Sequence, residues 1–111
     1  MFNLQKTLEE EIEFKGVGLH SGAKVNLCLK PAEANHGIKF KRTDVDSDKN
    51  IIEANYKNVS PSPLCTKIKN SHGISVSTIE HLMAAFYGEG IDNVIVEINA
   101  PEVPIMDGSS F

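Results

Sequence analysis

The sequence contains no tryptophan and only one arginine, Arg42. Eleven Lys and Arg residues stand against fifteen Asp and Glu residues, which gives a net charge of −4. Proteins dedicated to nucleic acids usually carry a basic excess with several arginines, and many stack bases on aromatic side chains. With five Phe and two Tyr among 111 residues, this chain offers little of either. Nucleic-acid binding is therefore disfavoured.

Long apolar segments are also missing. No apolar run approaches the roughly 18 residues that span a bilayer. The N-terminal segment leads into the acidic run Glu9-Glu10-Glu11 without the apolar core of a signal peptide. The two cysteines, Cys28 and Cys65, are far apart and form no Cys-x-x-Cys pair. We therefore expect a cytoplasmic protein from a reducing compartment.

Alternation of apolar and polar residues dominates the chain, whose length fits a single domain. It is clearest in residues 25–30, 38–42 and 94–98, and it is weaker in residues 51–59. A hairpin is predicted around Asn70-Ser71-His72-Gly73, between residues 64–69 and 74–77. The pattern predicts an α+β fold, with a mostly antiparallel sheet of about five strands packed with helix as a two-layer sandwich.

One segment has a convincing helical period. Ile79, Leu82, Met83 and Phe86 follow the i, i+3, i+4, i+7 spacing of one apolar stripe. Ser77 and Glu80 fit a capping box, which predicts a helix that starts after Ser77 and ends at Gly88. A single short helix leaves part of the apolar sheet face bare. We therefore expect the chain to self-associate.

The pair Glu80-His81 is the first candidate for chemistry. Both side chains point away from the apolar stripe, and the neighbouring Ala84 and Ala85 are small. A neutral imidazole can hold zinc, and a carboxylate beside it can activate water. From pattern alone the structural interpretation is favoured, because Glu80 is already explained as the capping-box partner of Ser77 and exposed helical histidines are common. Neither metal-helix motif, His-Glu-x-x-His or His-x-x-Glu-His, is present.

Two further features have a functional and a structural interpretation. Residues 16–22, GVGLHSG, miss the spacing of a phosphate-binding loop. They fit either a tight loop that brings His20 near a ligand or, more simply, a glycine-rich strand bend. Cys65 could be a nucleophile, but its apolar surroundings in the sequence favour a buried, inert thiol.

Four separated stretches, in order along almost the whole chain, resemble the UDP-3-O-acyl-N-acetylglucosamine deacetylases. This family of zinc enzymes commits bacteria to lipid A synthesis. The stretches are residues 16–22 (GVGLHSG), 64–66 (LCT), 77–85 (STIEHLMAA) and 90–109, which begins GIDN and ends APEVPIMDGS. Because four motifs agree, the resemblance is far more specific than a single short pattern.

The resemblance implies a protein of two similar domains with the active site between them. Residues 1–111 would be the N-terminal domain, cut before its second helix, with the C-terminal domain absent. His81 would be a zinc ligand and Glu80 the general base. Leu19 and His20 would line the substrate cleft, and Cys65 would lie near the metal without ligating it. The substrate would be the UDP-linked, acylated amino sugar, from which hydrolysis of the acetamide releases acetate.

The chain departs from the family pattern in two respects. Pro63 stands where an apolar residue such as Met is expected. None of the four histidines is followed four residues later by Asp, as in the His-x-x-x-Asp motif that supplies the family's other zinc ligands. The 111 residues alone are therefore expected to be inactive, with an incomplete zinc site. The alternatives are a non-catalytic α+β interaction or RNA-binding module, and a cysteine hydrolase using Cys65.

Overall fold

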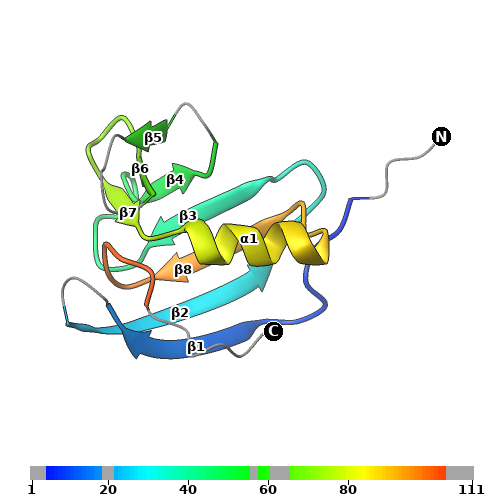
Figure 1. The fold of residues 1–111 in the computed structure, drawn as a ribbon. Coiled ribbons are helices and arrows are strands. Elements are labelled where there is room, and N and C mark those ends of the chain that lie inside the picture. Colours follow the sequence, from blue (N-terminus) through cyan, green and yellow to red (C-terminus); the bar gives the residue numbers. More distant parts are fainter. Residues whose placement is uncertain (1–4, 19–21, 56–57, 61–65, 105–111) are drawn as a thin grey trace.

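The computed structural model describes residues 5–18, 22–55, 58–60 and 66–104. Two sheets and one helix make up this part of the chain (Figure 1). In chain order the elements are β1 (Ile12–Val17), β2 (Lys24–Pro31), β3 (Ile38–Arg42), β4 (Ile51–Glu53), β5 (Val59–Ser60), β6 (Lys67–Lys69), β7 (Ser75–Ser77), α1 (Glu80–Glu89) and β8 (Val94–Ile98). The α+β class that the alternation predicted is confirmed.

The larger sheet has five strands in the order β1-β2-β8-β3-β4. Its pairs are antiparallel except for β3 with β8, which run parallel from Ile38↔Val94 to Arg42↔Ile98. The smaller sheet has three antiparallel strands in the order β5-β6-β7. The predicted hairpin between residues 64–69 and 74–77 is thus present as β6 and β7, while residues 51–59 form two short strands instead of one.

The inner face of the larger sheet is built by the alternating apolar residues. Leu27, Phe40 and Val96 come from three neighbouring strands and are fully buried. Burial of side chains of this size contributes about 1.5–3 kcal/mol each. The intervening residues, such as Lys30 and Glu97, lie on the opposite face, where their Nζ and Oε1 atoms are 3.2 Å apart. Alternation therefore fixes which side of the sheet carries the core.

The second layer over that face combines α1 with the smaller sheet. Figure 1 shows α1 lying across the larger sheet, with β5, β6 and β7 beside its first turn. Leu82 and Phe86 of α1 join Ile68 of β6 and Val76 of β7 in the same buried core. The predicted bare apolar face is therefore absent over β2, β3 and β8, whereas Ile12 and Phe14 on the same face of β1 are only partly buried. One helix is too small to cover the face, and the second sheet extends the cover. Self-association stays a prediction.

The predicted start of the helix is also wrong. Ser77 does not cap α1: it is the last residue of β7, and its hydroxyl donates to the Pro101 carbonyl. The N-cap position is Ile79, which has no side-chain cap bond. At the other end, Gly90 adopts φ 69° and its N–H bonds back to the last turn, so α1 ends one residue beyond the predicted Gly88.

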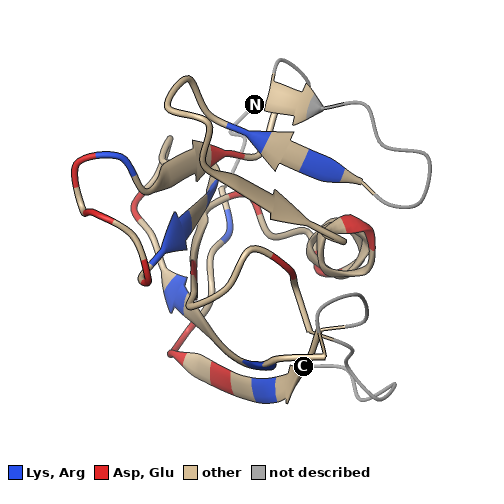
Figure 2. Ribbon diagram, turned by 90° about the vertical axis from the view of Figure 1, so that its left-hand side faces the viewer, with Lys and Arg blue, Asp and Glu red and all other residues tan. Residues whose placement is uncertain are grey.

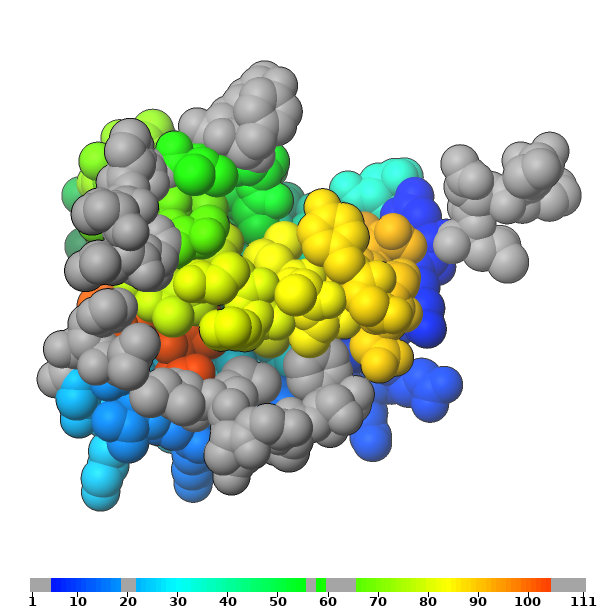
Figure 3. Space-filling view, viewed as in Figure 1, coloured from blue at the N-terminus to red at the C-terminus, as the bar shows by residue number. Residues whose placement is uncertain are grey.

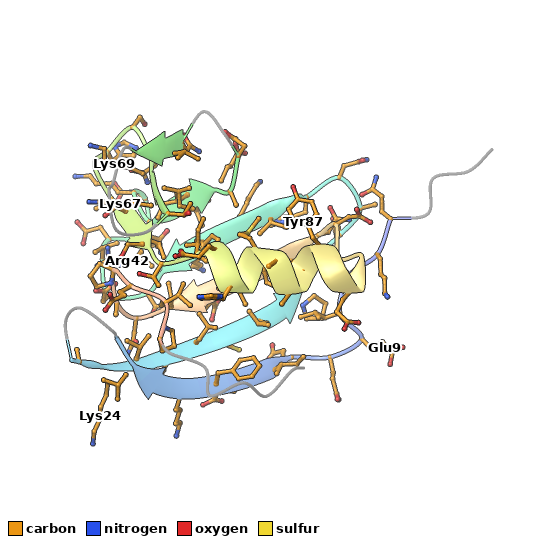
Figure 4. All side chains as sticks on the ribbon, viewed as in Figure 1. Glu9, Lys24, Arg42, Lys67, Lys69 and Tyr87 are labelled. Atoms are coloured by element: carbon orange, nitrogen blue, oxygen red, sulfur yellow. The ribbon has the colours of Figure 1, made fainter. Side chains whose placement is uncertain are left out.

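Arg42 joins the two sheets. Its Nε and Nη2 atoms donate to the two carboxylate oxygens of Asp44 at 2.8 and 2.7 Å, and its Nη1 donates to the Ser75 carbonyl in β7 at 3.0 Å. Figure 4 shows Arg42 at the end of the sheet nearest β7. This bidentate pair holds the pKa of Asp44 below its ordinary value, chiefly through the hydrogen bonds from Arg42.

Candidate active site at the start of α1

The segment between β7 and α1 is clamped by the backbone of Thr66. The Thr66 carbonyl accepts hydrogen bonds from the N–H groups of Thr78 at 2.8 Å and Ile79 at 3.4 Å. The Thr66 N–H donates to Oε1 of Glu80 at 3.3 Å. Both polar groups of one residue therefore hold the start of the helix. Because no capping box forms, the Thr66 carbonyl accepts hydrogen bonds from N–H groups at the helix start that have no partner within the helix.

Thr78, in the middle of this junction, has φ 61°. The left-handed region is unfavourable for a β-branched residue, and such strain costs about 1–3 kcal/mol. Among the described residues, the buried Thr78 Oγ1 has no hydrogen-bond partner. The surrounding structure must therefore hold this conformation through the backbone, which the bond to Thr66 does.

Glu80 and His81 follow at once, in the first turn of α1. Glu80 is half-buried, whereas His81 and Ala84 are exposed. The expectation that the pair faces away from the apolar stripe is confirmed for His81. Its imidazole lies on a helix that crosses the middle of one molecular face, as the space-filling view shows (Figure 3). The ring can therefore reach a ligand or another protein segment.

The helix contains acidic residues, Glu80 and Glu89, but no Lys or Arg (Figure 2). Glu80 lies in its first turn, and no basic residue stands in its last turn. A carboxylate in the first turn is favourable, because the helix N-terminus bears partial positive charge. His81 therefore stands beside one carboxylate, Glu80, which itself lies at the partially positive end of the helix.

A second predicted motif approaches the same junction. Gly18, the third residue of the glycine-rich stretch, forms an isolated antiparallel bridge with Pro104. Glu102, two residues earlier, forms a parallel bridge with Ser77, and the Val103 N–H donates to the Ser77 carbonyl at 3.0 Å. Residues 102–104 therefore link Gly18 to Ser77, three residues before α1. No local pattern in the sequence predicts this link.

Three of the predicted site residues, Leu19, His20 and Cys65, lie outside the described residues. Glu80 and His81 are consecutive residues in the first turn of α1, and the roles of all five residues stay predictions. Cys28, the other cysteine, lies on the opposite face of the larger sheet. Burial and then the nearby Glu11 carboxylate raise the pKa of its thiol, so the free thiol is kept protonated.

The described residues do not form a complete metal site. No group of three or more His, Cys, Asp or Glu side chains within them could hold a metal ion. The exposed imidazole of His81, with the Glu80 carboxylate beside it, fits one ligand and one base of a catalytic zinc site. The remaining ligands would have to come from elsewhere.

No helix of the described part has the length and apolar character of a membrane span.

The chain belongs to a family of deacetylases. Residues 5–111 match the family model described as UDP-3-O-acyl N-acetylglycosamine deacetylase, LpxC. Among curated proteins, the UDP-3-O-acyl-N-acetylglucosamine deacetylases of Vibrio atlanticus and Vibrio campbellii are each 53% identical to it over 106 residues. The match covers 96% of this chain and 34% of each relative, so the chain spans about a third of their length.

Proposed function

We propose that this chain forms the N-terminal domain, residues 1–111, of a zinc-dependent deacetylase. The enzyme would hydrolyse the acetamide of UDP-3-O-acyl-N-acetylglucosamine and release acetate, in the lipid A pathway of the bacterial cytoplasm. The observation that carries the proposal is the 53% identity to curated deacetylases across 96% of the chain. The adjacent Glu80 and His81 at the clamped start of α1 support it.

In this proposal His81 holds zinc through its exposed imidazole, and the other ligands come from a second domain. Zinc, when bound, acts as a Lewis acid that polarises the acetamide carbonyl and acidifies water. Glu80 takes the proton of the attacking water. Because its Oε1 is held by the Thr66 N–H, the proton would go to Oε2. The tie to Thr66 also restricts the side chain, which favours a reactive geometry.

The proposed cleft is completed by Leu19, His20 and Cys65. The bridge between Gly18 and Pro104, together with the bridge between Ser77 and Glu102, links Gly18, which precedes Leu19 in the sequence, to the segment before α1. In this role Leu19 and His20 contact the substrate, and Cys65 lies near the metal as a neighbour. These contacts bind and orient the acylated sugar.

The test is acetate release from UDP-3-O-acyl-N-acetylglucosamine by the full-length protein. A chelator should abolish turnover, and added zinc should restore it. Alkylation of thiols should leave most of the activity. Loss of activity on alkylation with full resistance to chelators would instead support a cysteine hydrolase. Binding without any turnover would support a non-catalytic module.

A further inference from the structure

We infer that Thr78 is a positioning residue whose left-handed backbone fixes the start of α1 and thereby orients Glu80 and His81. The inference rests on the proposed function of that pair. Thr78 precedes Glu80 by two residues and has φ 61°. It touches neither substrate nor metal in this role. It acts through the direction in which the chain leaves β7 and enters the helix.

The hydrogen bonds around Thr78 show what holds this direction. On one side, the Ser77 N–H donates to the Pro101 carbonyl at 2.8 Å. On the other side, the Thr78 N–H donates to the Thr66 carbonyl at 2.8 Å. Thr66 in turn donates its own N–H to the Glu80 carboxylate. Thr78 therefore lies within a series of hydrogen bonds that ends at Glu80, the proposed general base.

The side chain of Thr78 gives no simpler reason for its presence. Its Oγ1 is buried and has no partner among the described residues, so the hydroxyl is not a helix cap. Glycine would adopt φ 61° without the clash of a Cβ atom. A β-branched residue, however, has fewer accessible conformations than glycine. Threonine at this position therefore gives a stiffer junction than the residue that the backbone angle would favour.

A stiff junction matters because the next turn carries both chemical groups. A displacement of about 1 Å at a reacting group can cost about 10²-fold in rate. Glycine at position 78 would preserve the average path of the chain while widening its motion. The loss should therefore fall on the chemical step, with little change in substrate binding or folding.

The experiment compares Thr78→Gly, Thr78→Asn and Asn35→Gly in the full-length protein. Asn35 is the matched control, because it also has positive φ, 67°, but lies in the turn between β2 and β3. Asparagine tolerates the left-handed region while keeping a Cβ atom. The readouts are kcat, KM, zinc content, thermal unfolding and hydrogen exchange of the amides of residues 78–81.

Thr78→Gly should lower kcat by about tenfold or more, while KM changes by less than about twofold. Exchange at residues 78–81 should become faster, while the melting temperature should not fall, because glycine relieves the strain of the positive φ. Thr78→Asn should restore most of kcat and of the protection, and Asn35→Gly should leave both unchanged.

Wild-type kcat and exchange in Thr78→Gly would overturn the inference, as would equal losses in Asn35→Gly. If the wild-type protein itself releases no acetate, the proposed function fails. Hydrogen exchange at residues 78–81 then decides the positioning role by itself: faster exchange in Thr78→Gly supports it, and unchanged exchange overturns it.

Discussion

Oε1 of Glu80 accepts a hydrogen bond from the backbone N–H of Thr66 at 3.3 Å, which ties the first residue of α1 to the residue before β6. The bond needs an oxygen acceptor but no negative charge. An amide side chain of the same shape can therefore keep it. This separates the structural role of Glu80 from the chemical role that we propose for it.

Glu80→Gln in the full-length protein should keep the fold and bound zinc but lower kcat by about 10²- to 10⁴-fold. The glutamine oxygen still accepts from Thr66, but an amide cannot take a proton from water. Acetate release, metal content and thermal unfolding measure the three properties. Near-normal kcat with zinc bound would mean that Glu80 serves only to fix the helix start.

His81→Ala in the full-length protein should release zinc and abolish turnover with little loss of stability. His81 is exposed, so its removal leaves no cavity in the core. Metal content after gel filtration measures the effect. His72→Ala is the matched control, because His72 is exposed in the turn between β6 and β7. Stoichiometric zinc in His81→Ala would refute the ligand role.

Asp44→Asn should destabilise the fold by about 1 kcal/mol at neutral pH, because it weakens the charge-assisted bonds to Arg42. The pKa of Asp44 is lowered in the folded state. Its stabilising effect is therefore full above the unfolded pKa of about 3.9 and is lost as the pH falls through the lower folded value. Urea unfolding at several pH values should show the wild-type advantage shrinking below about pH 4.

The control for this experiment is Asp48→Asn, an exposed aspartate in the same loop. It should change stability by less than about 0.5 kcal/mol. An equal effect of both substitutions would show that general charge, and not the bond between Arg42 and Asp44, is responsible.

The 111 residues by themselves should show no deacetylase activity and no tight zinc binding. A catalytic zinc needs three protein ligands, and the described residues contain no group of three that could hold an ion. Zinc titration by calorimetry and an acetate assay test both expectations. Turnover by this chain alone would overturn the argument for an active site shared between two domains.

The same 111 residues are expected to self-associate, now for a different reason. Most of the inner sheet face is covered, but Tyr87, which lies beside α1 in Figure 4, is 82% exposed. Exposed aromatic side chains are frequent anchors of protein interfaces. Light scattering over a range of concentrations should show a dimer that Tyr87→Ser weakens. A monomer at every concentration would contradict the expectation.

The sequence predicted well those features that depend on local periodicity. Period-two alternation located β2, β3 and β8, and the spacing of Ile79, Leu82 and Phe86 located the helix and its buried face. Residues 51–59 were harder to assign. They divide into β4 and β5, which belong to different sheets, and no local pattern in one strand names its partner.

The details of the site depend on contacts between distant residues, and the sequence could not supply them. Ser77 and Glu80 match a capping box in the sequence. In the structure, however, Ser77 pairs with β6 as the last residue of β7, and its hydroxyl donates to the Pro101 carbonyl. Contacts with distant residues therefore determine the role of Ser77, and the local motif does not. The positive φ of Thr78 carries no sequence signal, because threonine is among the residues least suited to it. Glycine or asparagine at position 78 would have indicated a positive φ, because these residues commonly adopt the left-handed region.

The central place of β8 has a consequence for the order of folding. β8 pairs with β2 on one side and β3 on the other, yet it is the last strand of the described chain. During synthesis, the hairpins β1-β2 and β3-β4 therefore emerge from the ribosome as separate pieces whose inner edges have no neighbour. Closing the sheet joins segments far apart in the chain, which slows folding. Until residue 98 has been synthesised, the exposed edges of β2 and β3 can pair with strands of other chains. These edges are therefore the segments that a chaperone would need to protect.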